Sequence, residues 1–299
     1  MNKPFFSVIV PTYERHQKLE ACLDSLSNLD YPNDLFEVII IDDGSATPPE
    51  HIVTEYSRKI RVSLIVQPHA GPAAARNAGA AEARGELLAF TDSDCAMEKD
   101  WLTAMADAFR KTPDAIIGGH TMNRLTDNIY STASQLIIDY LYSYYNAEKN
   151  RARFLASNNM AVSAEIFHAV GGFDQSFSLA AAEDRELCDR WLFNGYQLVY
   201  APKAIVYHAH SMNLCSFWRQ HFNYGTGAFR FHKARKKRTK EKITIEPLLF
   251  YINLLRYPFS QVKGLKTVPL VTLMGISQIV NAMGFYRMKF SQPDQEGIN

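Results

Sequence analysis

The stretch LLAFTDSDCAME, residues 87–98, places two carboxylates directly after a run of apolar residues. The apolar run predicts a buried strand, and Asp92 and Asp94 follow it with only Ser93 between them. In extended backbone, residues two apart point the same way, so the two carboxylates would share one face. Two like charges that close favour either a retained proton or a bound cation, and Mg²⁺ or Mn²⁺ suits carboxylate oxygens. The alternative is a polar turn in which an aspartate caps the next helix.

Polar side chains also follow other predicted strands. They are Pro11, Thr12 and Glu14 after the first strand, Asp42 and Asp43 after the second, and Asp92 and Asp94 after the fourth. Because ligands of open α/β sheets bind beyond the carboxyl ends of the strands, this clustering predicts a binding site there. Gly71-Pro72 opens a helix that carries Arg76, and a helix start with an arginine could hold a diphosphate. The alternative for Arg76 is a surface position on an alanine-rich helix.

Two more groups of titratable residues lie in the second half of the chain. Glu183 and Asp184 stand at the start of a predicted helix, where acidic residues also complement the helix dipole without any catalytic role. His208 and His210 are two apart at the end of a predicted strand, and either would serve as a further metal ligand. A single histidine at such a position also fills ordinary structural roles.

The composition restricts the class of protein. Of 299 residues, 47% are hydrophobic and 21% are charged, as in a globular protein with a large core. The formal net charge of +1 gives no reason to expect a nucleic-acid partner. The four cysteines are far apart and form no CxxC motif, which predicts reduced thiols and a cytoplasmic location. The first apolar stretch is too short for the core of a signal peptide plus a cleavage site.

Strands and helices alternate through the first 120 residues. The runs FSVIVPT, FEVIIIDD, VSLIVQ, ELLAFTD and AIIGGH are typical of buried strands. The segments 16–29, 49–59, 71–85 and 101–112 have helical patterns. This alternation predicts an α/β fold with a mostly parallel sheet covered on both faces.

The second half has a different pattern. Residues 128–150 predict an amphipathic helix whose aromatic stripe belongs to the core or to the wall of an acceptor site. Residues 157–174 predict a strand, a helix and a Gly-Gly turn, and residues 198–211 predict a pair of strands.

Seven segments, in this order, resemble family 2 glycosyltransferases of bacterial type with the GT-A fold. They are SVIVPTYERHQKLEACLDSL, VIIIDDGSAT, GPAAARNAG, ELLAFTDSD, NNMAVSAEIFHAVGGFD, AEDRELCDRW and YHAH. The resemblance implies a Rossmann-like nucleotide-binding half in a mixed, mostly parallel sheet flanked by helices. We expect a glycosyltransferase domain at 1–230, with a nucleotide-sugar-binding half at 1–120 and an acceptor and catalytic half at 121–230. A basic and apolar helical tail would follow at 231–299.

The resemblance implies roles for residues at the first two strand ends. Pro11, Thr12 and Glu14 would line the nucleotide pocket. Asp42 would hydrogen-bond the base, and Asp43 would support it.

The resemblance also implies a metal and diphosphate site. Arg76 would lie near the diphosphate. Asp92 and Asp94 match the DxD element of the family, with Asp94 as the closer metal ligand and Asp92 in contact with ribose or metal. His208 would be the third ligand, with His210 as the alternative.

Asp184 matches the general base of the family, and Glu183 beside it would contact substrate. Processive polymer synthases of the family carry a QxxRW element, which this chain lacks. The segment FWRQHFNYGTG occupies the comparable region, with Arg219 and His221 as expected phosphate contacts. The missing element indicates a non-processive enzyme that adds a single sugar.

Together these roles predict an inverting, metal-dependent hexosyltransferase. Mn²⁺ or Mg²⁺, with Arg76, would stabilise the charge that develops on the leaving diphosphate, and Asp184 would activate the acceptor hydroxyl. UDP is the expected nucleotide because it predominates in the family, and GDP is second. A sugar-1-phosphate nucleotidyltransferase is one rival, but VPTYERH lacks the glycines of its phosphate loop. A non-catalytic binding protein of the same fold is the other, and it should have lost Asp94 or Asp184.

The tail is basic and then apolar. The run RFHKARKKRTKEK precedes two apolar stretches at 245–259 and 267–287. The second stretch has about the ~20 residues that a membrane span needs, yet Pro269, Gln278 and Asn281 dilute it. It therefore predicts a helix that lies in the membrane interface or packs on the domain.

The basic run would attract anionic lipids, and a lipid-linked acceptor of polysaccharide or glycolipid assembly would account for both features. The enzyme would then be peripheral on the cytoplasmic face of the inner membrane. The alternative is that the tail closes the active site or forms an oligomer.

Overall fold

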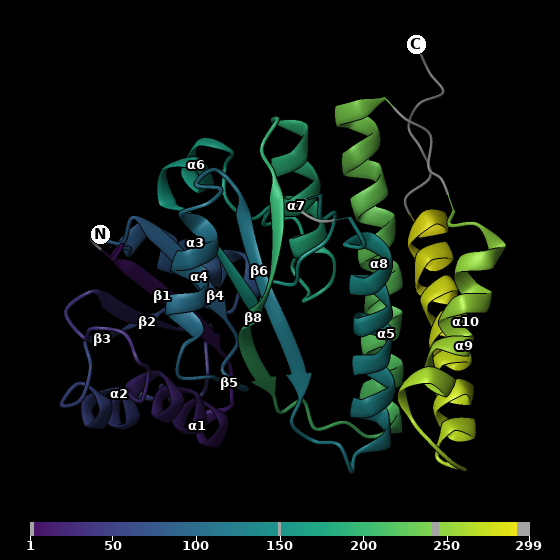
Figure 1. Cartoon of the computed structure of the whole chain (residues 1–299), viewed down its shortest axis with the longest axis horizontal. Helices are drawn as coiled ribbons and strands as arrows, with labels where there is room; N and C mark the ends of the chain where they lie inside the picture. Colours follow the sequence, from purple (N-terminus) through teal and green to yellow (C-terminus); the bar gives the residue numbers. More distant parts are fainter. Residues whose placement is uncertain (1–2, 149–150, 241–244, 292–299) are drawn as a thin grey trace.

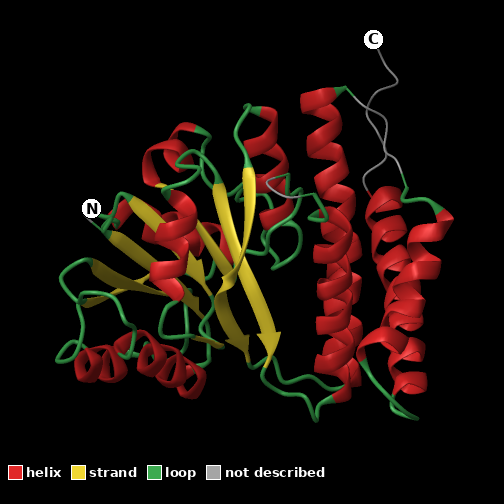
Figure 2. Cartoon of the chain, viewed as in Figure 1, coloured by secondary structure: helices red, strands yellow, loops and turns green. Residues whose placement is uncertain are grey.

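The computed structural model describes residues 3–148, 151–240 and 245–291, and it places a mixed sheet beside a layer of long helices (Figures 1 and 2). The strands are β1 (Phe6–Thr12), β2 (Phe36–Asp42), β3 (Val62–Val66), β4 (Leu87–Thr91), β5 (Cys95–Met97), β6 (Ile116–Asn123), β7 (Asn159–Ser163) and β8 (Leu198–His208). The helices are α1 (His16–Ser27), α2 (Glu50–Tyr56), α3 (Pro72–Glu82), α4 (Trp101–Phe109), α5 (Ile129–Tyr145), α6 (Ala164–Ala169), α7 (Glu183–Phe193), α8 (Leu214–Thr239), α9 (Leu248–Gln261) and α10 (Thr267–Ser291). The predicted α/β class is confirmed. Parts of the predicted helix at 128–150 and of the tail, residues 149–150, 241–244 and 292–299, lie outside the described residues.

The sheet combines a parallel half with a half of mixed direction, in which β6 and β8 are parallel. Its strand order is β3-β2-β1-β4-β7-β6-β8-β5. The first four strands in that order are mutually parallel, whereas β7 runs antiparallel to both its neighbours and β5 runs antiparallel to β8. β1, β2 and β4 are almost entirely buried because helices cover both faces, which is why they read as continuous apolar runs.

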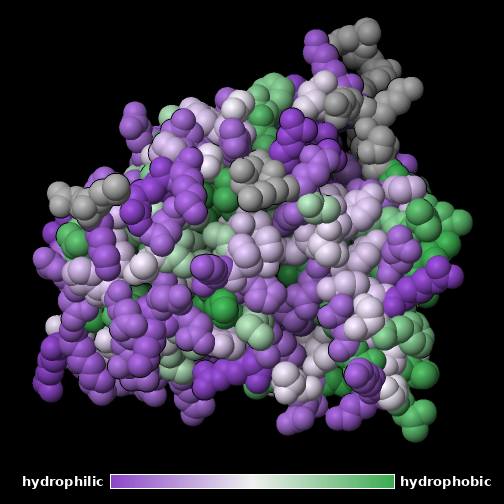
Figure 3. Space-filling view, viewed as in Figure 1, coloured by the Kyte–Doolittle hydropathy of each residue, from purple (hydrophilic) through white to green (hydrophobic). Residues whose placement is uncertain are grey.

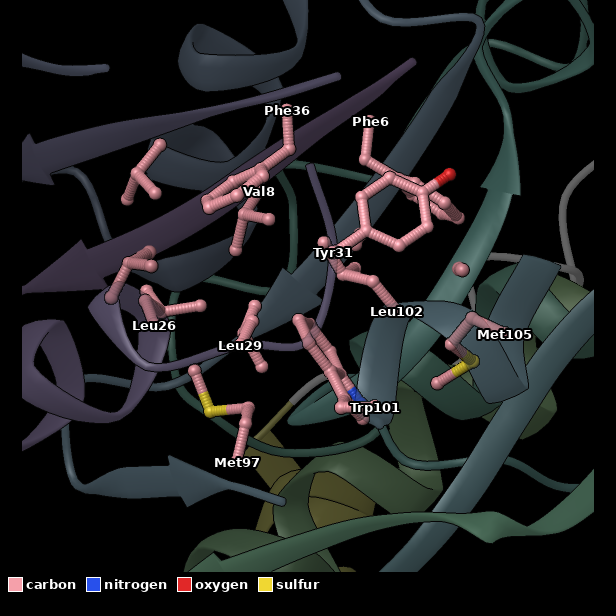
Figure 4. Packing of buried hydrophobic residues seen from close by; sticks show 14 of the residues in the cluster. Phe6, Val8, Leu26, Leu29, Tyr31, Phe36, Met97, Trp101, Leu102 and Met105 are labelled. Atoms are coloured by element: carbon pink, nitrogen blue, oxygen red, sulfur yellow. The ribbon is translucent and has the colours of Figure 1, made fainter. Parts of the chain in front are cut away.

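One side of the core packs α1 and α4 against the sheet, as Figure 4 shows for residues that include Phe6, Phe36 and Trp101. The Trp101 indole N–H donates to Asn159 Oδ1 at 2.9 Å. The amide of Asn159 in turn donates to the carbonyls of His120 and Ala204, at 3.1 and 3.0 Å. Asn159 therefore joins β7 to β6 and β8 where the sheet changes direction.

Residues 198–211 do not form the predicted pair of strands. They contain one strand of 11 residues, β8, whose register against β6 shifts between Gly119 and His120. A side chain at Gly119 would collide with the Ala204 carbonyl, so this glycine leaves room for the irregular part of β8. The shift bends the strand without ending it.

Four helices stand side by side against one end of the sheet: α5, α8, α9 and α10 (Figure 1). α8 and α10 approach closely, since a side chain at Gly225 or Gly284 would collide with the Asn281 or Phe222 carbonyl of the opposite helix. An apolar cluster from α5, α8, α9 and α10 fills the space between them. The stretch 267–287 therefore packs on the rest of the protein, one of its two expected arrangements.

α8 continues across residue 230, where we expected the tail to begin. The division into a nucleotide-binding half, an acceptor half and a tail stays a prediction.

The outer surface of α9 and α10 is apolar, and it forms the green area at the right edge of Figure 3. Its exposed apolar residues include Leu248, Leu249, Phe259, Val268, Ile279, Met283 and Phe290. By length and composition α10 could cross a membrane. Its most apolar stretch of 18 residues has a mean hydropathy of 1.5, and 28% of that stretch is buried in the protein.

Candidate active site

Asp92 and Asp94 lie in a tight turn, and the expectation of extended backbone was wrong. The N–H of Cys95 donates to the Asp92 carbonyl at 3.0 Å, and β5 begins at Cys95 because that residue pairs with His208 of β8. The alternative prediction of a polar turn is therefore correct for the backbone, although the turn leads into a strand and not into a helix. The two carboxylates line one cavity but have different partners.

Basic and imidazole groups surround Asp94, whose side chain is 1% exposed. Its Oδ2 accepts hydrogen bonds from Arg15 Nη1 at 3.0 Å and Lys18 Nζ at 3.2 Å. Its Oδ1 lies 3.1 Å from His208 Nε2, and His210 Nδ1 lies 3.6 Å from Oδ2. Burial alone would raise the pKa of Asp94, but hydrogen bonds from both histidines and the charges of His208 and Arg15 hold it well below its usual range.

The donor set around Asp94 fits a hard divalent ion. Ligand atoms of Asp94, Cys95 and His208 all lie within 4.8 Å of one another. Burial raises the pKa of Cys95 well above its usual range, so its thiol stays protonated and belongs to the apolar core. A carboxylate and an imidazole remain, which suit Mn²⁺ or Mg²⁺ when diphosphate oxygens complete the shell. Arg15 and Lys18 neutralise the carboxylate in this structure and would have to give way.

Arg76 connects the turn after β4 to the start of α7. Its side chain is 3% exposed; Nη2 donates to Asp92 Oδ1 at 2.8 Å, and Nη1 donates to Glu183 Oε1 at 3.1 Å. Its Nε has no hydrogen-bond partner among the described residues. The predicted helix start at Gly71-Pro72 is confirmed, and it places this guanidinium between two carboxylates.

Glu183 and Asp184 form the first turn of α7. Burial, and then the charge of Asp184, raise the pKa of Glu183 to about 7, although Arg76 opposes the shift. Burial also raises the pKa of Asp184, whose Oδ1 accepts the Arg185 N–H at 2.7 Å. A carboxylate with a raised pKa is a stronger base when ionised, so Asp184 has the properties that proton removal requires.

The backbone before these carboxylates is strained and tightly packed. Ala182 has a φ of 70°, in the left-handed region that residues with a side chain rarely adopt. Gly227 of α8 lies against this loop, and a side chain there would collide with the Ala181 carbonyl. α8 thus holds the loop that orients Glu183 and Asp184.

Asp42 and Thr12, at neighbouring strand ends, have buried oxygens without partners. The Oδ2 of Asp42 accepts the Ser45 N–H at 3.0 Å, but Asp42 Oδ1 and Thr12 Oγ1 have no hydrogen-bond partner among the described residues. Buried polar atoms in this state are typical of sites that a ligand completes. Pro11 and Thr12 are the last two residues of β1, inside the strand and not after it.

Asp43 and Glu14 fix the loops around that strand edge. Asp43 accepts the Ala70 and Gly71 N–H groups, both at 2.9 Å, and so supports the start of α3. Glu14, with a φ of 52°, accepts the Ala46 N–H at 2.7 Å. These residues lie near the proposed nucleotide position, but they do not line the cavity that contains Asp94.

That cavity has a volume of about 660 Å³. Its charged end is lined by Arg76, Asp92, Asp94, Glu183, Asp184 and His208. α5, α8, α9 and α10 form its other walls. The structure therefore brings the DxD carboxylates, the expected base and the expected histidine ligand to one space.

Arg219 lies outside this space, so the expectation that it contacts phosphate is not supported. It is exposed on α8, while Gln220, His221 and Tyr224 face the cavity because they lie on the other side of the helix. His221 is 2% exposed, and burial lowers its pKa to about 4, so its imidazole is neutral at pH 7.

The motifs in the sequence did not reveal three residues of this site: Arg15, Lys18 and Tyr224. A signal for the first two was present, since Arg15 and Lys18 are three apart at the start of the first helix and directly follow a strand end. Tyr224 stood inside the segment that replaces QxxRW, with nothing to distinguish it from its neighbours.

Residues 7–171 match the sequence model of the glycosyl transferase family 2. Glycosyltransferase AglE of Haloferax volcanii is 26% identical over 208 residues, which cover 69% of this chain and 67% of AglE. The pre-mycofactocin glycosyltransferase of Mycobacterium tuberculosis is 28% identical over 231 residues, 74% of this chain but only 46% of that protein.

Solved structures share the fold. The mannosyltransferase PcManGT from Pyrobaculum calidifontis, in complex with GDP-Man and Mn²⁺, has a TM-score of 0.66 at 17% identity, covering 96% of this chain and 88% of that chain. Residues 1–349 of S. aureus TarS in complex with UDP-GlcNAc have a TM-score of 0.55 at 18% identity, covering 96% and 91%. The predicted GT-A architecture with a C-terminal apolar helix is confirmed.

Proposed function

Because this chain belongs to glycosyl transferase family 2, we propose that it moves a single sugar from a nucleotide-diphosphate sugar to an acceptor hydroxyl, with inversion. The observation that carries the proposal is the convergence of Asp94, His208 and Asp184 at one end of a single cavity, where Arg76 joins Asp92 to Glu183. Retention of Asp94 and Asp184 favours an enzyme over a non-catalytic binding protein of the same fold. Family membership argues against the nucleotidyltransferase alternative.

The donor would bind across the carboxyl ends of the parallel strands. The partnerless oxygens of Asp42 and Thr12 would accept hydrogen bonds from the base, with Pro11, Asp43 and Glu14 shaping the pocket. UDP is the proposed nucleotide. The structure of TarS with UDP-GlcNAc supports this choice. GDP is the second candidate nucleotide, because PcManGT was solved with GDP-Man.

Asp94 and His208 would hold Mn²⁺ or Mg²⁺, with Asp92 toward the ribose or the ion. A bound divalent ion supplies positive charge that stabilises the leaving diphosphate. Arg76 adds a permanently charged guanidinium at the same end of the cavity, already aligned by Asp92 and Glu183.

Asp184 would remove the proton of the acceptor hydroxyl on the face of the sugar opposite the leaving group. One in-line displacement breaks the anomeric C–O bond, forms the new one and inverts that carbon. Because its pKa is about 7, Glu183 would be protonated in part of the molecules near neutral pH. Asp184 could then ionise without a second negative charge beside it.

Calorimetry with UDP tests the donor and metal parts of this proposal. UDP should bind tightly only when Mn²⁺ or Mg²⁺ is present, and Asp94→Ala should remove that dependence. Asp34→Ala, at an exposed position outside the cavity, is the matched control and should bind as wild type. Binding of unchanged strength without metal would contradict the proposal.

We also propose that the tail docks the enzyme on the cytoplasmic face of the inner membrane, where it would meet a lipid-linked acceptor. The apolar surface of α9 and α10 supports this, as do Lys263, Lys266, Arg287 and Lys289 at the ends of α10. Each basic residue near an anionic bilayer contributes roughly 1 kcal/mol, and the apolar surface adds binding that resists salt.

Flotation with liposomes tests docking. The protein should float with anionic vesicles, less with neutral ones, and less still as the double variant Leu249→Ser, Phe259→Ser. Val66→Ser, which alters an exposed apolar residue of β3, should float as wild type. A protein that stays at the bottom with every lipid would refute docking, and a dimer in solution would assign the apolar surface to an oligomer.

A further inference from the structure

The cavity extends well beyond its charged end into an apolar part, which we call the apolar branch. It lies among the helices α5, α9 and α10 and does not reach the parallel half of the sheet. The side chains that define it are Ile138, Leu141, Tyr145, Phe250, Tyr251, Leu254, Phe285 and Tyr286. A nucleotide sugar offers nothing that would match such a surface.

We propose that the apolar branch binds the hydrocarbon chain of an amphiphilic acceptor whose hydroxyl reaches Asp184. This inference rests on the proposed function, because it assigns the acceptor to the same cavity. It names the chemical class of the acceptor: a polar head that carries the reacting hydroxyl, joined to a long alkyl or prenyl chain.

Two residues of α8 connect the carboxylates to the branch. Tyr224 is half-buried beside the charged end; desolvation raises the pKa of its phenol, and the charges of Asp184, Glu183 and Asp92 raise it further. The ring of His221 follows, with its centroid 5.6 Å from that of Tyr224. Polar groups are therefore spaced along one helix from the carboxylates toward the apolar branch.

His221 supplies a specific contact for the head of such an acceptor. Its Nε2 is buried, lines the cavity and has no hydrogen-bond partner among the described residues. The ring packs on Phe217 with the centroids 4.3 Å apart, so the protein fixes its orientation. A neutral imidazole in this position would hydrogen-bond the polar linkage at the point where the acceptor changes from polar to apolar.

The branch suits a hydrocarbon better than a sugar chain. The carboxylate of Glu246 accepts the Tyr144 hydroxyl at 3.1 Å and the Tyr145 hydroxyl at 2.7 Å, so these polar groups are already satisfied. Gln278 and Asn281 also line the cavity, but the apolar side chains that define the branch offer sugar hydroxyls few partners, whereas each buried methylene gains affinity.

The far end of the branch meets the apolar surface of α9 and α10. Ile245 and Tyr286 line the cavity and are 74% and 45% exposed. Arg287 follows directly along α10, beside the ring of Phe222. The branch therefore has a partly exposed apolar rim, through which a chain could enter from an anionic bilayer.

Binding of n-alkyl phosphates from ethyl to decyl, below their micelle concentrations, tests the inference in the full-length protein. Calorimetry should show affinity rising about fourfold per methylene and then levelling once the branch is full. A matched series of n-alkyl glucosides should show the same gain in affinity per methylene, because the chain sets that gain. The absolute affinities should differ, because the heads differ. Affinity that does not depend on chain length would overturn the inference.

Two matched substitutions locate the chain. Leu141→Trp fills the branch and should abolish the dependence on chain length, whereas Leu249→Trp, on the exposed side of α9, should leave it intact. Should Leu141→Trp fail to fold, Leu141→Ala enlarges the branch and should extend the rise to longer chains. An unchanged slope in a folded Leu141 variant would also overturn the inference.

UDP binding, measured in the same samples, separates the two proposals. A wild-type protein that shows no chain-length slope but binds UDP in a metal-dependent way rejects the apolar branch as a chain site and leaves the donor site standing. An intact slope in a protein that does not bind UDP upholds the branch as a chain site and rejects the proposed donor.

Discussion

Lys18 Nζ lies 3.2 Å from Asp94 Oδ2, so an ammonium group already occupies the carboxylate proposed to hold a divalent ion. Arg15 reinforces it from the same helix start, at 3.0 Å. A metal ion at the proposed site would therefore compete with these two ion pairs for one carboxylate.

Removing either basic residue should raise the affinity for Mn²⁺ measured without donor. Both side chains are partly exposed, so each pair contributes about 0.5–1 kcal/mol, and Lys18→Ala or Arg15→Ala should tighten binding by roughly two- to fivefold. Calorimetry measures this, with Lys59→Ala as an exposed control and Asp94→Asn as the variant that should not bind. Unchanged or weaker binding in both alanine variants would exclude competition.

Arg76→Met should destabilise the fold strongly. The substitution leaves Asp92 and Glu183 without their shared partner, and the loss of one member of a buried ion pair costs about 3–5 kcal/mol. Urea unfolding gives the difference. Arg151→Met, which breaks an exposed pair with Glu148, should stay within about 0.5 kcal/mol of wild type. Similar losses in both variants would show that Arg76 has no special structural role.

Glu183 should lower the free energy of unfolding as pH rises from about 4.5 to about 7, whereas His221, whose pKa burial lowers from 6.5 to about 4, should raise it over the lower part of that range. The native protein keeps a proton on Glu183 over this window, since burial raises its pKa from 4.5 to about 7, while the unfolded chain has released it. The loss is at most about 3 kcal/mol. Asp94, with its pKa held low, acts in the opposite sense and loses its stabilisation only as pH falls below about 4.

Urea unfolding at pH 5 and pH 8 isolates the contribution of Glu183 as a difference between variants. From pH 5 to pH 8, Glu183→Gln should gain stability relative to wild type, because the amide cannot ionise. Glu148→Gln, at an exposed position, should change with pH as wild type does. A pH dependence of Glu183→Gln identical to that of wild type would refute the contribution of Glu183.

Asp184→Asn should lower turnover by about 10²–10⁴-fold, the range expected when a general base is lost. The amide keeps the size of the side chain, so metal-dependent UDP binding should remain close to wild type. Asp127→Asn, at an exposed position outside the cavity, controls for a general effect of the substitution. Normal turnover in Asp184→Asn would refute the assignment.

Gly227→Ala and Gly275→Ala should act in opposite directions. Both glycines lie inside long helices, but a methyl group at Gly227 would collide with the Ala181 carbonyl, whereas at Gly275 the nearest atom is 3.9 Å away. Gly275→Ala should gain up to about 1 kcal/mol from helix propensity. Gly227→Ala should displace the loop before Asp184 and reduce turnover, and equal melting temperatures and activities for the two variants would contradict this.

The parallel half of the fold was predictable because its signals are local. Each of β1, β2 and β4 is a short apolar run that lies between turn residues, and the helix starts are marked near the positions where α1, α3 and α4 begin. The residues at these strand ends, among them Asp42 and Asp94, then follow from topology alone.

What the sequence did not show depends on partners far along the chain. β5 has only three residues, and its pairing with His208 creates the turn at Asp92 and Asp94. The contact between Lys18 and Asp94 joins positions 76 apart. The register shift between β6 and β8 requires that Gly119 has no side chain, because the Ala204 carbonyl lies against it. Nothing in the sequence of residues 198–208 indicates this contact.

The pairing of β5 with β8 has a consequence for how the chain acquires its site during synthesis. β8 lies more than 100 residues after β5 and is also the only described strand that pairs with it. A nascent chain that has emerged through residue 171 can assemble β1 to β4 with β6 and β7, yet β5 and the adjoining turn have no strand to pair with. The turn at Asp92 and Asp94 cannot gain its β5–β8 pairing before β8 has been made, so the proposed metal site would be completed only late in synthesis.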